Sequence, residues 1–291
     1  MNQLYRILAL GLCSLLSSCF LFETGAEDPA MSEGAGTPDD GTAKDGAAKD
    51  GAAKDGAAKD GAAKDGAARD GAAKNGAAKD GGDGFVTIFD GKSLAGWEPT
   101  EGTKNAWVVE DGAIVGYGDK GRGYLTYEKK DIRDLEMKMK YRFPGNGNSG
   151  VSIRAVKDET GKRDFKSYHA DIGHLGIGRQ VLGAWDFHTP GRREHACLRG
   201  DRLVIDKDDK PTLTKIDGAV TKDDIKKNDW NDLHIIAVGD NFKFFINGKP
   251  AAEFTEHLDP AKRLDRGMIQ LQLHDPGMIV QFKDIELKVL D

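Results

Sequence analysis

The chain has 291 residues, of which 31% are charged and 38% are hydrophobic, and its formal net charge is −6. This acidic balance gives no basic footprint for nucleic acid. No segment matches a phosphate-binding loop, a dinucleotide-binding fingerprint or an HExxH zinc helix, so nothing indicates a nucleotide-dependent enzyme or a zinc peptidase of that kind.

The first nineteen residues read as an export signal. Arg6 supplies a positive charge, residues 7–16 form a short apolar run, and Leu16-Ser17-Ser18-Cys19 resembles a bacterial lipobox. A run of this length is too short to span a bilayer and is typical of a signal peptide. We therefore expect a signal peptide over residues 1–18 and lipidation of Cys19; the alternative is an ordinary secretory signal with a chance cysteine. Phe20 after the cysteine favours a lipid-anchored protein of the bacterial cell envelope, at the outer membrane.

Residues 19–83 are predicted to be a low-complexity linker. Between Gly41 and Asp80 the pentapeptide GAAKD and its close variants occur eight times, and no unit carries a large apolar residue to bury. Such a segment cannot form a packed core. As a coil, forty residues reach about 32–38 Å, which would tether a domain near the membrane. Binding of this segment to an anionic cell-wall polymer is the alternative to a plain spacer.

Residues 84–291 are expected to form one all-β domain. Short runs of β-type alternation, punctuated by Gly, Asn and Asp, are typical of a sandwich or barrel, and we predict a lectin-like jelly-roll β-sandwich. The predicted strands are Trp107–Glu110, Ala113–Val115, Leu135–Phe143, Gly150–Val156, Ser167–Ile172, Leu203–Ile205, Leu233–Val238, Phe242–Asn247, Met268–His274 and Val280–Val289. Gly239-Asp240 predicts a hairpin turn. Residues 173–202 show little periodicity and are expected to be either a functional loop or a disordered segment. As a functional loop they would form a rim or lid with Trp185, His188, Arg192, Arg193 and His195.

Polar side chains recur on one face of three predicted strands. Because side chains alternate along a strand, the polar residues of each strand lie on the face opposite to its apolar residues. These polar sets are Ser152 and Arg154 in the first strand, His169 and Asp171 in the second, and Gln270, Gln272 and His274 in the third. If the three strands share a sheet, its non-core face holds these residues. The purely structural alternatives are that His274 caps a turn, that Asp171 only orients an imidazole, and that Arg154 is an ion-pair partner of Asp171 or Glu136. Asn148 and Ser149 are as compatible with turn formation as with substrate contact.

Four sequence blocks, taken together, resemble one family. They are FVTIFDGKSLAGW (residues 85–97), NGNSGVSIR (146–154), WNDLHIIAVGDNFKFFINGK (230–249) and the LQLH of the strand ending at His274. In this order they resemble the 3-keto-disaccharide hydrolase domain family, formerly catalogued as a domain of unknown function. The resemblance covers residues 85–291 and implies a lectin-like β-sandwich that acts on carbohydrate.

The chain differs from that family at two positions, 169 and 171. Many relatives show Tyr-Glu-x-Gln-Ile where this chain has Tyr168-His169-Ala170-Asp171-Ile172. Either the acid–base pair has been rebuilt with His and Asp, or the activity has changed. The resemblance implies cleavage of a 3-keto-glycoside, in which the keto group acidifies the C2 proton. On this reading His169, backed by Asp171, is the base, and His274 is the acid or the donor that stabilises the enolate.

The remaining expectations concern ligands. Arg154, Gln272, Asn148, Trp185 and Arg192 are the predicted substrate-binding residues, and the expected partner is a glycan or an oxidised oligosaccharide. No cofactor is required; the alternative is a divalent metal, for which His169-x-Asp171-x-x-His174 offers nitrogen and oxygen ligands. Cys197 is expected to be a buried structural cysteine. The rival functional hypothesis is a non-catalytic carbohydrate-binding module tethered to the envelope.

Overall fold

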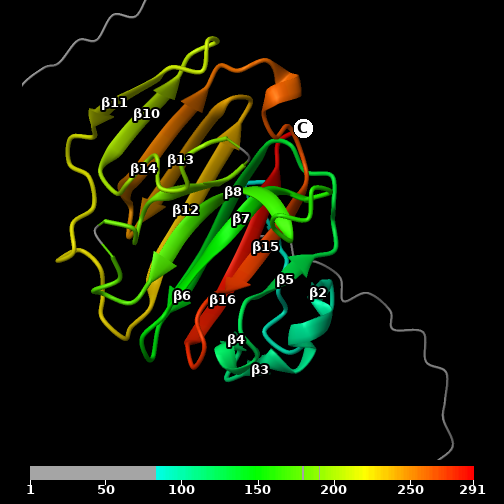
Figure 1. Cartoon of the computed structure of the whole chain (residues 1–291). Coiled ribbons are helices and arrows are strands. Elements are labelled where there is room, and N and C mark those ends of the chain that lie inside the picture. The colour runs from blue at the N-terminus through cyan, green and yellow to red at the C-terminus, as the bar shows by residue number, and fades with distance from the viewer. Residues whose placement is uncertain (1–82, 179, 190) are drawn as a thin grey trace, which may run out of the picture. The chain divides into compact units, whose positions relative to one another are not determined.

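The computed structural model of the protein describes residues 83–178, 180–189 and 191–291 (Figure 1). The predicted signal peptide, Cys19 and, apart from Asp83, the predicted linker lie outside the described residues. The described part forms two β-sheets with three short 3-10 helices. These helices are η1 (Glu101–Ala106), η2 (Gly118–Lys120) and η3 (Pro260–Lys262). No helix in the described ranges is both long and apolar enough to cross a bilayer.

The larger sheet runs in the order β11-β10-β14-β13-β12-β6-β16-β4-β3, with β1 paired to β16. Its pairs are antiparallel except β10 with β14, which run parallel. Its strands are β1 (Val86–Thr87), β3 (Trp107–Glu110), β4 (Ala113–Tyr117), β6 (Leu135–Arg142), β10 (Asp201–Ile205), β11 (Pro211–Lys215), β12 (Asn231–Val238), β13 (Asn241–Ile246), β14 (Lys249–Glu256) and β16 (Ile279–Val289).

The smaller sheet runs in the order β2-β5-β15-β7-β8-β9, and all its pairs are antiparallel. Its strands are β2 (Trp97–Pro99), β5 (Gly123–Tyr127), β7 (Asn148–Lys157), β8 (Phe165–Gly173), β9 (Trp185–His188) and β15 (Met268–Leu273). The predicted all-β sandwich is therefore confirmed. The three strands expected to share a sheet are β7, β8 and β15, which lie side by side in it.

Local sequence explains the strands that were expected. In β6 the apolar residues of LEMKMKYR alternate with charged ones, and burial alternates in step, as a strand with one solvated face requires. The Gly239-Asp240 turn joins β12 to β13 with Val238 opposite Asn241, which confirms the predicted hairpin. The turn at residues 275–277 does not form a hairpin. It carries the chain from β15 in the smaller sheet to β16 in the larger one.

The core fills the space between the two sheets. It is rich in aromatic rings: Tyr168 of β8 packs against Phe242 and Phe254 of the larger sheet, with ring centroids 4.8 and 5.1 Å apart. Trp185 is fully buried beside Phe254, with centroids 5.3 Å apart. Aromatic pairs at these separations stabilise a core by about 0.5–1.5 kcal/mol beyond the area they bury. Cys197 is also buried here, as expected.

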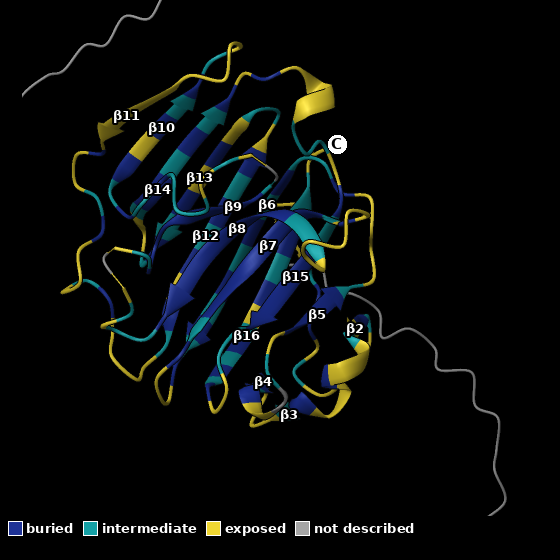
Figure 2. Ribbon diagram, in the orientation of Figure 1, coloured by how far each residue is buried: buried dark blue, intermediate teal, exposed yellow. Residues whose placement is uncertain are grey.

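The central strands of the smaller sheet are buried on both faces. Every residue of β8 from Ser167 to Gly173 is buried, and so is most of β7 and β15 (Figure 2). Alternation alone predicted a buried face and an open one. The open face is wrong for these strands, because their polar side chains are covered as completely as their apolar ones.

Candidate functional site

The covered polar face is built by the registers of five neighbouring strands. Residues directly opposite one another in antiparallel strands share a face. One row across the sheet therefore places five polar side chains together: Thr126, Gln270, Ser152, His169 and Asp186. A second set comprises Tyr124 and Gln272, which are paired, Asp171, which lies opposite Gly150, and Ser167 opposite His188.

This face contains several buried polar atoms that have no hydrogen-bond partner in the described part of the chain. They are His169 Nε2, Asp171 Oδ2, Asp186 Oδ1, Gln270 Oε1, Gln272 Oε1 and Asn148 Oδ1. Buried polar atoms are nearly always paired in folded proteins, because leaving one unpaired costs about 1–3 kcal/mol. A concentration of such atoms on one sheet face is therefore typical of a functional site rather than of a structural core.

His169 occupies the centre of the face. Its ring lies over Gly150, where an added Cβ would come within 2.1 Å of Nε2. Only a residue without a side chain fits at this position of the strand. Its Nδ1 lies 2.9 Å from Ser152 Oγ, and its ring stacks on His188 with centroids 4.8 Å apart. Asp171 does not orient this imidazole as expected, because its Oδ1 is 3.9 Å from Nε2. Ser152 takes that role.

Both stacked imidazoles are held in the neutral form. Burial lowers the pKa of His169 well below its ordinary value, with further lowering by His188, His274 and Arg122. Burial, followed by the charge of Arg163, lowers the pKa of His188 from 6.5 to about 4. The two rings are therefore unprotonated, and able to accept protons, across the physiological pH range.

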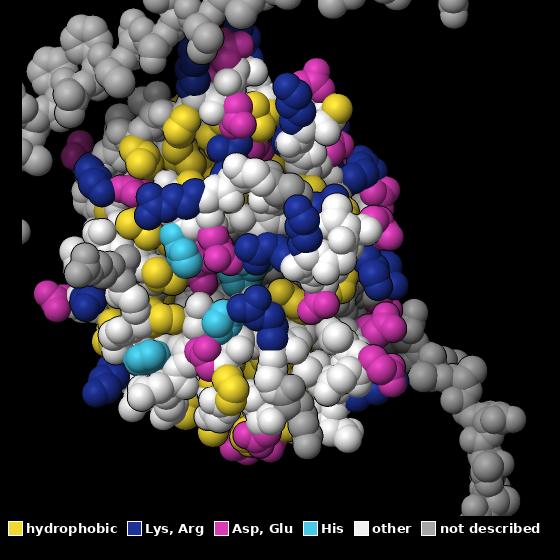
Figure 3. All heavy atoms as spheres, viewed as in Figure 1, with side chains coloured by type: hydrophobic (Ala, Val, Ile, Leu, Met, Phe, Trp, Pro, Cys, Tyr) yellow, Lys and Arg dark blue, Asp and Glu magenta, His cyan; other side chains and the backbone are white. Residues whose placement is uncertain are grey.

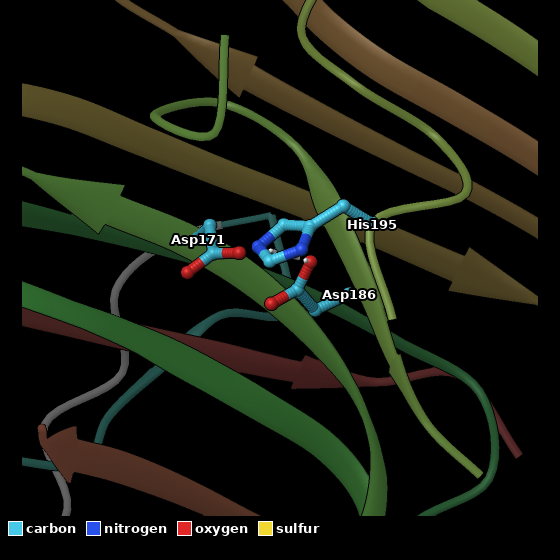
Figure 4. Close-up of side chains that lie close together, drawn as sticks. All are labelled: Asp171, Asp186 and His195. Carbon is cyan, nitrogen blue, oxygen red and sulfur yellow. Dashed lines mark ion pairs between the residues drawn. The ribbon is translucent and has the colours of Figure 1, made fainter. Parts of the chain in front are cut away.

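Asp171, Asp186 and His195 form a second cluster on the same face (Figure 4). Burial, and then the neighbouring carboxylate of Asp186, raise the pKa of Asp171 well above the ordinary range. Burial also raises the pKa of Asp186. His195 Nε2 lies 3.4 Å from Asp186 Oδ1.

A groove of about 560 Å³ lies beside the polar face. Its lining residues are Arg122, Tyr124, Gly161, Lys162, Arg163, Asp164, Phe165 and His188. Three of these carry positive charge and one carries negative charge, so the groove is cationic. The rings of Tyr124 and Phe165 meet edge to face with centroids 5.3 Å apart. Figure 3 shows imidazoles among basic and acidic side chains near the middle of the face turned to the viewer.

The sequence-predicted residues fall into two groups. His169, Asp171 and Gln272 share the polar face, and Asn148 begins β7 close enough to Asp171 to lower the pKa of its carboxyl. His274 follows the last residue of β15; its Nδ1 lies 2.6 Å from Asp275 Oδ1 and its Nε2 lies 2.5 Å from Arg122. Arg154, Trp185 and Arg192 form the second group, and none of them belongs to this face.

The placement of Arg154 was wrong because β7 contains a bulge. The pairing of β7 with β8 shifts register between Ile153 and Val156, and Arg154 adopts a positive φ of 48°. This interruption turns the side chain to the core side, where it bonds Asp134 at 3.1 Å and lies over the Phe242 ring. It also donates to the carbonyls of Arg133, Leu264 and Gly239. Arg154 is thus a structural ion-pair residue, as the alternative interpretation held, but its partner is Asp134 rather than Asp171 or Glu136.

Trp185 and Arg192 are also misplaced by the sequence interpretation. Trp185 is a core residue with no exposed surface, and its indole N–H donates to the carbonyl of Ala252. Arg192 pairs with Asp209 at 2.6 Å and with Glu256 at 3.4 Å. Because Glu256 is bonded by the core residue Tyr168, this ion pair belongs to the opposite side of the sheet from His169.

The sequence interpretation missed Asp186, Arg122 and Tyr124, and it named His188 only as part of a rim or lid. Asp186 and His188 lie on β9, inside a segment that was predicted to be an irregular loop, and their alternation in Trp-Asp-Phe-His was the available signal. Tyr124 lies on β5 and Arg122 immediately precedes that strand, which was not predicted. The proposed metal triplet does not form as predicted, because His174 Nδ1 lies against the Gly147 backbone.

Comparison with known proteins gives a family match over almost all of the described residues. The sequence profile of the 3-keto-alpha-glucoside-1,2-lyase-like domain matches residues 84–288. A curated relative, a 3-keto-disaccharide hydrolase of Bacteroides thetaiotaomicron, is 33% identical over 91 residues. The alignment covers 28% of this chain and 31% of the relative, so it spans about a third of that protein's length.

Two solved structures are similar to this chain at low sequence identity. A Parabacteroides distasonis protein described as a glycosyl hydrolase is 21% identical, with a TM-score of 0.48; the match covers 72% of this chain and 94% of the other. A carbohydrate-binding module of Bacillus subtilis is 15% identical, with a TM-score of 0.41; coverage is 66% and 95%.

Proposed function

Because the chain belongs to the 3-keto-alpha-glucoside-1,2-lyase-like domain family, we propose that its domain cleaves 3-keto-glycosides by base-assisted elimination, followed by addition of water. The observation that carries this proposal is the neutral His188, which lines a cationic groove and stacks on His169. The glycan is the substrate, and the groove beside the polar face is where its oxidised ring binds.

The chemistry begins with a proton that the substrate itself makes acidic. A 3-keto group allows the electrons of the C2–H bond to delocalise onto the C3 oxygen, so a neutral imidazole can remove the C2 proton. The C1–O bond then breaks, the leaving oxygen takes a proton, and a C1=C2 double bond remains. Water adds across that double bond, with its hydroxyl at C1 and a proton at C2, to release the free 3-keto-sugar.

The groove supplies the charge that the elimination needs. Negative charge develops on the C3 oxygen, and the groove is lined by Arg122, Lys162 and Arg163. Fixed cations close to a developing oxyanion lower the barrier without reorganisation. The positive charges that help to lower the pKa of His188 also favour the enolate. The same groove therefore keeps the base neutral and stabilises the negative charge that proton removal creates.

His188 and His169 share the role that the sequence assigned to His169 alone. His188 lines the groove, whereas His169 is only 1% exposed and lies behind it. We assign His188 as the group that meets the substrate and His169 as its stacked partner, linked to it through Ser152 and Ser167. His274 bonds Asp275 through Nδ1 and accepts at Nε2 from the Arg122 guanidinium, so in this arrangement it positions Arg122 and is not the acid that the sequence predicted. The leaving oxygen then takes its proton from the imidazolium that His188 becomes after removing the C2 proton.

The burial of His169 favours one alternative function, a carbohydrate-binding module without catalytic activity. A catalytic imidazole has to reach its substrate, and His169 is covered in this structure. A binding module would use the groove, with sugar against Tyr124 and Phe165, and would not need either imidazole to move a proton.

Incubation of the purified protein with a chromogenic 3-keto-β-glucoside and with its unoxidised parent separates these functions. We expect chromophore release from the keto substrate alone, and a loss of about 10²–10⁴ in rate for His188→Ala. Arg122→Ala should lose about 10²–10³. His257→Ala is the matched control, since that exposed imidazole pairs with Asp240 outside the site. Glycan binding without release from either substrate would support the binding module.

We also propose that the domain is delivered to the cell envelope by the signal peptide and by lipidation of Cys19. The support is the lipobox-like Leu16-Ser17-Ser18-Cys19 and the repeat segment that follows it. Several acyl chains give stable anchoring where one does not. Fractionation of cells is expected to find the wild-type protein with membranes and Cys19→Ala in the soluble periplasm; equal membrane association of both would contradict anchoring at Cys19.

A further inference from the structure

The cluster of Asp171, Asp186 and His195 lies next to the imidazole pair without being used by the elimination described above. One ligand atom from each of the three residues can be chosen so that all lie within 4.8 Å of one another. Figure 4 shows the two carboxyl groups approaching each other, with the imidazole beside them. Asp171 comes from β8, Asp186 from β9, and His195 from the segment that follows β9.

The two carboxyl groups are buried and incompletely paired. The side chain of Asp171 is 1% exposed and that of Asp186 is 6% exposed. Asp171 Oδ2 and Asp186 Oδ1 have no hydrogen-bond donor among the described residues. Two like charges cannot be buried side by side without a compensating positive charge, which is either a shared proton or a bound cation. The additional imidazole favours the cation, since a proton shared by two carboxyl groups needs no nitrogen ligand.

A neighbouring combination is a weaker candidate. Asp186, His188 and Glu194 also lie within metal-ligand reach of one another. Glu194, however, is committed to an ion pair with Arg163 at 3.2 Å, and its side chain is 41% exposed. Arg163 would repel a cation placed there. Among the described residues no Lys or Arg side chain pairs with Asp171, so the set that contains Asp171 is the better cation site.

We propose that Asp171, Asp186 and His195 bind one divalent first-row transition-metal cation, of the Mn²⁺ or Zn²⁺ class. Two carboxylate oxygens and one imidazole nitrogen are ligands that both ions accept, and three protein ligands leave coordination positions open for water or substrate. The sequence pointed to His169 and His174 as nitrogen ligands; the fold supplies His195 in their place.

The position of this cation gives it a role that rests on the proposed function. Asp171 Oδ1 is 3.9 Å from His169 Nε2, so the metal lies beside the imidazole pair. A cation there would bind an oxygen of the oxidised sugar and help to stabilise the enolate. Metal binding itself does not depend on that role, and it is measured without any substrate.

The test is a titration of chelator-treated, dialysed protein with MnCl₂ and, separately, with ZnSO₄, followed by calorimetry and by the electron paramagnetic resonance signal of free Mn²⁺. We expect one equivalent to bind and at least a tenfold weaker affinity for His195→Ala and for Asp186→Asn. Glu194→Gln is the matched control and should stay within twofold of the wild type. His195 is 36% exposed on its side chain, so its replacement tests the site even if the buried Asp186 variant does not fold.

The outcomes separate this proposal from the elimination. No binding of either ion at millimolar concentration, or wild-type binding by His195→Ala, would overturn the metal site and leave a shared proton between the two carboxyl groups. Metal binding with the expected variant pattern, but no turnover of a 3-keto-glycoside, would support the site while removing the proposed function. Turnover that persists in protein shown to be metal-free would remove the cation's role in the elimination.

Discussion

The buried imidazole of His188 makes a quantitative prediction about stability and pH. In the folded protein burial lowers its pKa from 6.5 to about 4. Between these two values the unfolded chain binds a proton at this residue and the folded protein does not. Stability therefore falls as the pH falls through this window, and it is unaffected by His188 above it.

The magnitude follows from the two pKa values. At pH 7.5 both states are neutral at His188, and the residue contributes almost nothing to the pH dependence. At pH 5 the unfolded state is protonated and the folded state is not, which lowers the free energy of unfolding by about 2 kcal/mol, and by about 3 kcal/mol at pH 4. The raised pKa values of Asp171 and Asp186 act with the opposite sign. A comparison with a variant is therefore needed to isolate His188.

The assay is urea unfolding of the wild type and of His188→Asn at pH 7.5 and pH 5. Asparagine can keep a polar contact with Ser167 but does not titrate. Tryptophan fluorescence reports the transition, since Trp97, Trp107 and Trp185 are buried. We expect the wild type to lose about 2 kcal/mol more than the variant between the two pH values. His257→Asn, an exposed control, should track the wild type.

If the difference in free energy of unfolding between the wild type and His188→Asn is the same at pH 7.5 and pH 5, the reasoning is refuted. Such a result would mean that His188 titrates alike in both states, and hence that the groove does not hold a neutral imidazole. A larger loss in the variant than in the wild type would show that the sign is wrong. Either result would also remove the argument that assigns His188 as the proton acceptor.

Two further predictions concern side chains around the site. Gly150→Ala is expected to displace the ring of His169, because the new Cβ would lie 2.1 Å from Nε2; thermal unfolding should show a loss of about 1–3 kcal/mol, and turnover of the keto substrate should fall with it. Unchanged turnover would contradict the contribution of His169. Arg154→Met is expected to cost about 3–5 kcal/mol by breaking a buried ion pair with Asp134, while the folded fraction keeps the KM of the wild type; a specific rise in KM would restore a substrate-binding role for Arg154.

The strands that could be predicted from sequence are those with a single period and clear boundaries. β6 and β12 alternate over eight residues, β16 alternates on each side of a bulge between Lys283 and Glu286, and each was found close to its predicted bounds. β5 and β9 were missed because they are short, at five and four residues, and β5 also carries Tyr124 and Tyr127 on opposite faces. Short strands take their identity from their neighbours in the sheet, which the sequence does not show.

The site was predicted in part for a related reason. His169, Asp171 and Gln272 follow from uninterrupted alternation on strands that do pair. Arg154 does not, because one bulge reverses its side, and the only signal was Gly267, which lets the adjacent chain approach the bulge closely. His188 lay in a segment without clear periodicity. Tertiary pairing, rather than local pattern, brings it onto the face.

The central claim is that cleavage begins by removal of the C2 proton, and one measurement tests it directly. A 3-keto-glycoside carrying deuterium at C2 is incubated with the protein in ordinary water, and kcat/KM is compared with that of the undeuterated substrate. The account predicts a primary isotope effect, or, where proton removal is fast and reversible, loss of the label from recovered substrate; in either case the product carries hydrogen from water at C2. Product that retains its C2 deuterium, formed at the same rate, would show direct hydrolysis of the glycosidic bond and contradict the mechanism.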